Sequence, residues 1–152
     1  MSHLARTEKV EPFRAKLRAR QPALLLTLGD SNTSNAGFSD GAKQWPELLH
    51  TGLKERFGYE DLLLINAGVC GNTIQDAGRR LERDVLRFNP DLVMVCFGTN
   101  DRRLPADLFR AELTEVCRRI QAAGAVILLR TTLPILEKHP PPPHWWKNDG
   151  DL

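Results

Sequence analysis

The chain has 152 residues, of which 26% are charged and 41% are hydrophobic, and its formal net charge is +2. This size and composition are typical of one globular domain with a real core. A charge so close to zero gives no reason to expect a nucleic-acid partner, and no apolar run approaches the roughly 20 residues that span a bilayer. The three cysteines form no CxxC pair, which favours reduced thiols and predicts a cytoplasmic protein.

Residues 1–22 are predicted to form a polar N-terminal arm. Its basic residues are not followed by an apolar stretch, so we expect no secretory signal there. Val10, Phe13 and Leu17 fall at helical spacing, which predicts a short helix docked on the domain. A basic surface helix or a frayed terminus is the alternative.

Apolar runs alternate with helical patterns through residues 23–134. This alternation predicts βαβ units and a parallel sheet that is covered by helices on both faces. The predicted strands are residues 23–28, 62–65, 92–97 and 125–129, and the predicted helices are residues 45–57, 73–88 and 105–123.

The predicted helices carry apolar stripes at helical spacing. The stripe residues are Trp45, Leu48, Leu49, Leu53 and Phe57, then Ile74, Ala77, Leu81, Val85 and Phe88, then Phe109, Leu113, Val116, Cys117 and Ile120. Residues 79, 80, 82, 83 and 87 are among the charged positions of the middle helix. Thr73 and Asp76 form a weak variant of a capping box at its start.

The regular pattern stops after Pro134. Residues 135–152 form a predicted tail with consecutive prolines at 140–143, which favour an extended polyproline segment, and with Trp145 and Trp146. One more helix and strand would complete such a sheet. We therefore expect the sheet to lack its last helix and strand.

Polar, glycine-rich loops follow three of the predicted strands. Ser31 lies in the first loop, Gly71 in the second and Asn100 in the third. Loops at the carboxyl ends of parallel strands line one crevice, where ligands bind. Each loop alone also has a simpler explanation: Ser31 caps a turn, Gly71 permits a tight strand-to-helix turn, and Asn100 closes an Asx-turn.

Together the loops contain Gly-Asp-Ser, then N-x-G-x-x-G-N-T, then Gly-x-Asn-Asp, in that order along the chain. This combination resembles the GDSL or SGNH family of serine hydrolases over residues 23–134. The resemblance implies a flavodoxin-like three-layer αβα sandwich with the sheet order 2-1-3-4-5. It also implies a catalytic nucleophile at Ser31 and an oxyanion hole made by the Ser31 and Gly71 backbone amides and the Asn100 side chain. The implied reaction is hydrolysis of a small-molecule ester, without a metal or other cofactor.

The family's last motif is Asp-x-x-His, whose histidine is the base that activates the serine. None of the four histidines of this chain lies in such a motif. Two explanations stay open. The chain is a truncated form with impaired activity, which the early end of the strand and helix pattern favours, or His139 or His144 serves as a substitute base, oriented by Asp149 or Asp151.

A non-catalytic, flavodoxin-like module that binds an anion or a nucleotide is the alternative function. The chain has no G-x-G-x-x-G motif and no P-loop lysine, so a nucleotide fingerprint is a poor match. A sheet that lacks its last unit leaves one edge uncovered, which predicts self-association through that edge.

Overall fold

The structure is a computed structural model that describes residues 8–34 and 40–132. In this part of the chain a parallel sheet has the strand order β2-β1-β3-β4. Its strands are β1 (Ala23–Gly29), β2 (Leu62–Gly68), β3 (Leu92–Cys96) and β4 (Val126–Leu129), and the helices are α2 (Glu11–Arg18), α3 (Trp45–Phe57), α4 (Ile74–Asp84) and α5 (Ala106–Ala122). The order agrees with the first four strands of the predicted sheet.

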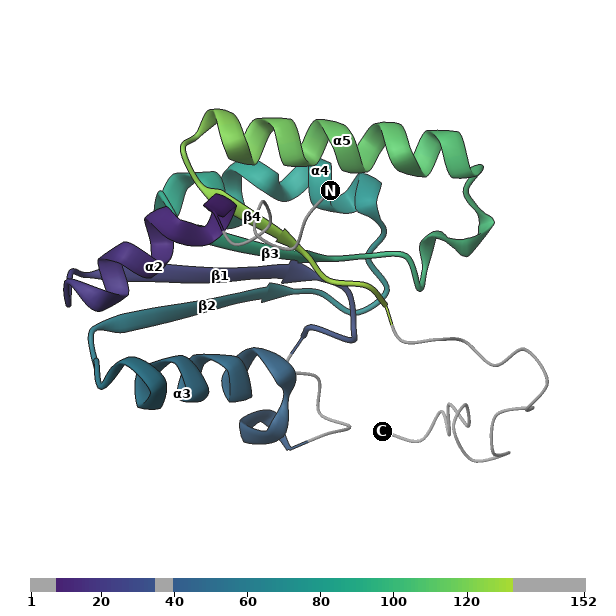
Figure 1. The fold of residues 1–152 in the computed structure, drawn as a ribbon. Helices are drawn as coiled ribbons and strands as arrows, with labels where there is room; N and C mark the ends of the chain where they lie inside the picture. The colour runs from purple at the N-terminus through teal and green to yellow at the C-terminus, as the bar shows by residue number, and fades with distance from the viewer. Residues whose placement is uncertain (1–7, 35–39, 133–152) are drawn as a thin grey trace.

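Helices cover both faces of the sheet (Figure 1). On one face, Leu26 and Leu28 of β1 pack in a core cluster with α4 and α5. On the other face, Leu25 of β1 packs in a second cluster with α2 and α3. Successive strand residues point to opposite faces, so a strand that is buried on both faces is apolar throughout. The predicted α/β three-layer sandwich is therefore confirmed.

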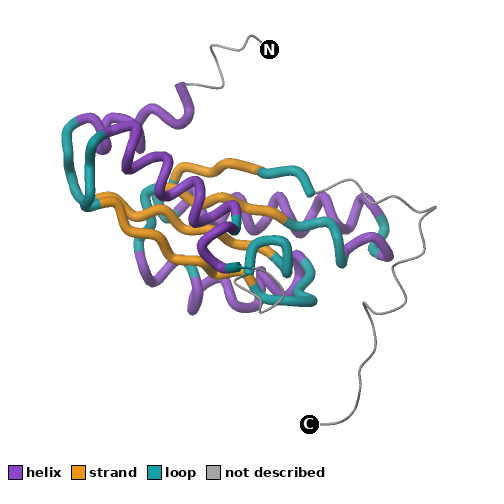
Figure 2. The backbone as a smooth tube through the Cα atoms, turned by 90° about the horizontal axis from the view of Figure 1, so that it is seen from below, coloured by secondary structure: helices purple, strands orange, loops and turns teal. Residues whose placement is uncertain are grey.

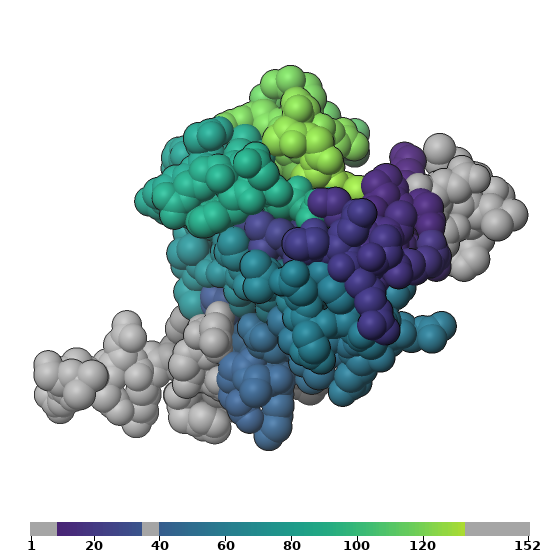
Figure 3. All heavy atoms as spheres, turned by 90° about the vertical axis from the view of Figure 1, so that its left-hand side faces the viewer, coloured from purple at the N-terminus to yellow at the C-terminus, as the bar shows by residue number. Residues whose placement is uncertain are grey.

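Helix α2 is the short docked helix that the spacing of apolar residues predicted. Phe13 and Leu17 are 4% and 1% exposed and lie in the same cluster as Leu25 and Leu92. From the end of the molecule shown in Figure 3, the purple residues of α2 lie against the blue and teal part of the chain. The division of the chain into an arm, a domain and a tail stays a prediction.

The observed elements differ from the predicted ones mainly at their ends. Strand β2 runs to Gly68, three residues beyond the predicted end, because Asn66 to Gly68 continue the parallel ladder with β1. Helix α4 ends at Asp84, and the chain continues as a short 3-10 helix, Leu86–Phe88, before Asn89 takes a left-handed φ of 48°.

Two residues of the predicted apolar stripes do not face the core. Leu48 is 57% exposed and Phe88 is 36% exposed. Phe88 follows the change from α-helix to 3-10 helix, which rotates it away from the direction of the α4 stripe, and its ring lies 4.6 Å below the Arg87 guanidinium. These two residues of the predicted stripes are therefore exceptions to the rule that a stripe faces the core.

Strand β4 is one of the two edge strands of the described sheet, since among the described residues it pairs only with β3. Leu128 and Leu129 of this strand are 36% and 59% exposed. Figure 2 shows the sheet from below, with the strands side by side. The described helices include none with the length and apolar character that a membrane crossing needs. The predicted tail lies outside the described residues.

Candidate active site

The turn after β1 carries Ser31. The N–H groups of Thr33 and Ser34 both donate to the backbone oxygen of Asp30, at 3.0 and 2.9 Å, so the chain folds back directly after the strand. A Cβ at Gly29 would lie 2.9 Å from the Cys96 oxygen and closer still to Thr33. Only glycine therefore allows this turn at the strand end, which leaves Ser31 half-buried beside the sheet.

The loop after β2 carries Gly71. Val69 donates from its N–H to the Gly29 oxygen at 3.0 Å, which holds the loop against the end of β1. Asn72 then donates to the Val69 oxygen at 3.2 Å, and Gly71 has a φ of 77°. A type II turn requires such a positive φ at its third residue, which favours glycine. Within the described part of the chain, the Gly71 N–H donates no hydrogen bond.

The loop after β3 is fixed by a buried carboxylate. Asp101 is 4% exposed and accepts hydrogen bonds from the Gly98 N–H at 3.0 Å and from the Ile74 N–H at 2.8 Å. Burial raises the pKa of Asp101, and the negative charge of the nearby Asp30 raises it further, against the two hydrogen bonds that lower it. Since Ile74 is the first residue of α4, this carboxylate joins the third loop to the helix that follows the second.

Asn100 connects the same two loops. Its Nδ2 donates to the backbone oxygen of Asn72 at 2.9 Å. A carboxamide nitrogen carries two N–H groups, so this bond fixes the direction of the side chain and leaves one donor for another acceptor. Asn100 is half-buried. It is therefore held next to the residue that follows Gly71.

The first loop is bonded to the third loop and to the end of β2. Asn32 donates from Nδ2 to Thr99 Oγ1 at 2.9 Å, and Asn66 donates from Nδ2 to the Thr33 oxygen at 2.8 Å. A Cβ at Gly68 would lie 2.7 Å from the Ser34 Cα, so the first loop packs directly on the end of β2. The three predicted loops thus meet beside the carboxyl ends of the strands.

Two bracing contacts were not predicted from the sequence. Trp45, at the start of α3, donates from Nε1 to the Asn32 oxygen at 2.9 Å, and the Arg130 guanidinium lies 4.8 Å above its ring. Arg80 of α4 is only 8% exposed and donates to groups at the ends of β1 and β2. The sequence spacing did indicate that Arg80 is buried, because Arg80 follows Ala77 by three residues and so lies on the buried side of the helix.

No base for Ser31 is found among the described residues. His50 is the one histidine in the described ranges, and its Nε2 lies 2.6 Å from the backbone oxygen of Leu62. Leu62 begins β2, so His50 is at the opposite end of the sheet from Ser31. His139 and His144 lie outside the described residues. The described ranges also hold no group of three or more side chains placed to bind a metal.

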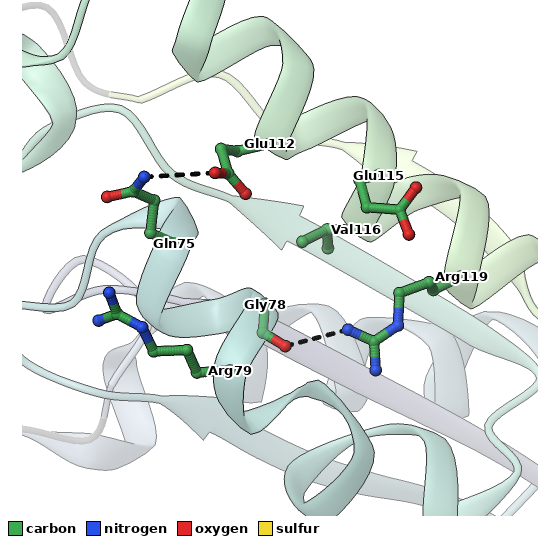
Figure 4. A pocket seen from close by; sticks show the side chains of 7 residues that line it. All are labelled: Gln75, Gly78, Arg79, Glu112, Glu115, Val116 and Arg119. Carbon is green, nitrogen blue, oxygen red and sulfur yellow. Dashed lines mark hydrogen bonds between the residues drawn. The ribbon is translucent and has the colours of Figure 1, made fainter.

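A separate hollow of about 310 Å³ lies between α4 and α5. The residues that line it include Gln75, which donates to Glu112 at 3.2 Å, and Arg119, which donates to the Gly78 oxygen at 3.1 Å (Figure 4). None of Ser31, Gly71 and Asn100 lines this hollow. It is therefore a groove between two helices, apart from the loops at the strand ends.

The fold and the site define an α/β protein in which three polar loops, which carry Ser31, Gly71 and Asn100, are hydrogen-bonded to one another or to the neighbouring strand ends where the parallel strands finish. The model of the GDSL-like lipase/acylhydrolase family matches residues 27–151, and the chain belongs to this family.

Similar proteins include an uncharacterized lipoprotein, YqeF, of Bacillus subtilis, which is 33% identical over 74% of this chain and 49% of its own length. An arylesterase of Vibrio mimicus is 32% identical over 72% of this chain and 55% of its own length. The crystal structure of TesA has a TM-score of 0.64 and is 30% identical over 70% of this chain and 58% of that one. The chain spans about half the length of the curated relatives that it matches.

Proposed function

We propose that this chain carries the nucleophile and the oxyanion hole of a serine ester hydrolase. The observation that carries the proposal is the hydrogen bond of 2.9 Å from Asn100 Nδ2 to the Asn72 oxygen. It holds a side-chain amide beside the Gly71 turn, at the carboxyl ends of the strands, where Ser31 also lies. Membership of the GDSL-like family and the similarity to an arylesterase and to TesA support the same function.

The proposed reaction begins when the Ser31 hydroxyl attacks the acyl carbonyl of an ester and a base takes its proton. The carbonyl oxygen becomes negatively charged in the tetrahedral intermediate. The backbone amides of Ser31 and Gly71 and the free N–H of Asn100 Nδ2 donate to it. Fixed donors of this kind stabilise the developing charge without having to reorient. The alcohol then leaves with a proton, and water hydrolyses the acyl-enzyme.

The base has two candidate sources. His139 or His144 of this chain is one, and a group that this chain does not contain is the other. A variant in which both histidines are alanine separates them. Loss of Ser31-dependent hydrolysis assigns the base to these histidines, and unchanged hydrolysis excludes them.

The experiment that tests the proposed function uses p-nitrophenyl acetate as a small ester and a fluorophosphonate probe as a label for the nucleophile. We expect hydrolysis and labelling by the parent chain, and the loss of both in Ser31→Ala. The matched control is Thr114→Ala, which removes an exposed hydroxyl of α5 that donates only to the Arg110 oxygen. A folded parent chain that is neither labelled nor active favours a module that binds an anion, or a chain that lacks the base.

The described sheet edge supports a further proposal, self-association of the chain through β4. The outer edge of β4 pairs with no strand among the described residues, and Leu128 and Leu129 of this strand are exposed. Unpaired strand edges are templates for pairing with another chain, and a second copy offers the same edge. Sedimentation at several concentrations tests this. The dimer fraction should rise with concentration in the parent chain and fall in Leu129→Lys, and a parent that stays monomeric overturns the proposal.

A further inference from the structure

Among the described residues, Arg80 is the only buried basic side chain, and no proposed chemical step uses it. It is 8% exposed, whereas the side chains of Arg79 and Arg83 on the same helix are 75% and 70% exposed. A buried guanidinium is costly unless its N–H groups find acceptors. The acceptors that Arg80 uses therefore indicate why it is buried.

Most of these acceptors belong to the candidate site. Arg80 Nε donates to Asn72 Oδ1 at 2.8 Å, Nη1 to the Ala67 oxygen at 2.8 Å and Nη2 to the Gly29 oxygen at 3.2 Å. Gly29 ends β1, Ala67 lies near the end of β2, and Asn72 follows Gly71. Only the contact of Nη1 with Asp84 Oδ2, at 3.2 Å, is an ion pair within α4.

Asn72 is held on both sides by the residues that surround it. Its side-chain oxygen accepts from Arg80, and its backbone oxygen accepts from Asn100 Nδ2 at 2.9 Å. A displacement of Arg80 is therefore transmitted through Asn72 to both proposed oxyanion donors, the amide of the Gly71 turn and the carboxamide of Asn100. Through Gly29, the same guanidinium also holds the strand end that precedes Ser31.

We propose that Arg80 is the positioning residue of the oxyanion hole, which it aligns through Asn72 against the ends of β1 and β2. This inference rests on the proposed function. The planar guanidinium has donors in several fixed directions, whereas a lysine ammonium is a single compact charge. Lysine at this position would keep the charge and the contact with Asp84 but would lose contacts to the loops. Arg80→Lys is therefore the informative variant, and Arg79→Lys on the exposed side of α4 is its matched control.

The kinetic experiment measures kcat and KM for p-nitrophenyl acetate. Arg80 touches no substrate in the proposed reaction, and a misplacement of about 1 Å costs on the order of 100-fold in rate. We expect Arg80→Lys to lower kcat by about 10- to 100-fold with little change in KM, and Arg79→Lys to leave both unchanged. A higher KM with an unchanged kcat overturns the proposal.

A double-mutant cycle tests whether Arg80 acts through Asn72. In an Asn72→Ala background, Arg80→Lys should lower kcat by less than about two-fold, because coupled residues do not have additive effects. Asn72→Ser replaces Asn72→Ala if the alanine variant does not fold. An effect of Arg80→Lys that is the same size in both backgrounds shows a general structural role and overturns the proposal.

A second measurement needs no turnover. ¹⁵N NMR of the parent, Arg80→Lys and Arg79→Lys chains compares the Gly71 amide and the Asn100 carboxamide. Both signals should shift, and the Gly71 amide should exchange faster with solvent, in Arg80→Lys alone. If a folded Arg80→Lys chain keeps the parent's signals, the positioning role is wrong. If the parent has no Ser31-dependent activity, the proposed function fails for this chain, and the NMR comparison alone decides the role of Arg80.

Discussion

Asn100 Nδ2 donates to the backbone oxygen of Asn72 at 2.9 Å, so a side chain that follows β3 is fixed by the main chain that follows β2. The bond uses one amide hydrogen and determines where the other points. The direction of the second donor is thus set by the fold before any ligand arrives. This preorganisation is what an oxyanion hole requires.

Removal of this amide is the first prediction. Asn100→Ala should lower kcat for p-nitrophenyl acetate by about 100- to 1,000-fold, because one oxyanion donor is lost, and should change KM little. Steady-state kinetics measure both. Asn89→Gly is the control, since Asn89 precedes β3 at the opposite end of that strand and glycine tolerates its left-handed φ of 48°. An equal loss of kcat in both variants contradicts the assignment.

The Gly71 turn gives a second prediction with a close control. Gly71 and Gly124 have φ values of 77° and 87°, and a Cβ at either would meet no atom within 4 Å. Gly71→Ala and Gly124→Ala should therefore each destabilise the fold by a similar amount, about 1–2 kcal/mol of left-handed strain, as denaturant unfolding would measure. Only Gly71→Ala should also reduce hydrolysis. Full activity in that variant would remove Gly71 from the proposed oxyanion hole.

The third prediction concerns the close approach of the first loop to β2. A Cβ at Gly68 would lie 2.7 Å from the Ser34 Cα, which is backbone and cannot rotate away. Gly68→Ala should lower the melting temperature and the activity together. Gly52→Ala, in the open middle of α3, should instead raise stability by roughly 0.5–1 kcal/mol, because alanine favours a helix over glycine. Thermal unfolding of the two variants beside the parent tests the contrast.

The fourth prediction is a pH dependence of stability. Hydrogen bonds from Arg83, and then from Arg80, lower the pKa of Asp84 from 3.8 to about 2. A lowered acid pKa stabilises the fold above its unfolded value, and this stabilisation is lost as the pH falls toward the folded value. Asp84→Asn should therefore cost roughly 1–2 kcal/mol at pH 7, discounted because Arg83 is exposed, and progressively less between pH 4 and pH 2.

Thermal unfolding across that pH range tests the sign of the effect. The control is Glu115→Gln, since the exposed pair of Glu115 with Arg118 should contribute nothing measurable. A difference between Asp84→Asn and the parent that grows as the pH falls would contradict the assignment.

The sheet and its edge of polar loops could be predicted because their signals are local. Apolar runs bounded by glycine and polar residues predict buried strands. The carboxyl ends of parallel strands necessarily lie on the same side of the sheet. The ladder between β1 and β2 was longer than predicted because Asn66 and Gly68 are poor strand formers by themselves. Pairing with β1 overrode that preference.

The contacts that orient the site could not be predicted in the same way. The bond from Trp45 to Asn32 and the bond from Arg80 to Asn72 join residues whose relative positions depend on the packed fold. An arginine in a helix is normally a solvated residue, so its charge gave no indication that Arg80 is buried. The exposure of Leu48 was missed for the opposite reason, since an apolar side chain need not face the core.

The start of α4 has a consequence for which charged molecules can bind beside the strand-end loops. The first N–H of the helix, that of Ile74, already donates to the Asp101 carboxylate, and Thr73 and Asp76 exchange hydrogen bonds in a capping box. A permanent anion such as phosphate would have to displace a buried carboxylate and meet its repulsion. In the proposed reaction, a neutral ester would bind without that conflict, and negative charge would develop only when Ser31 attacks the carbonyl.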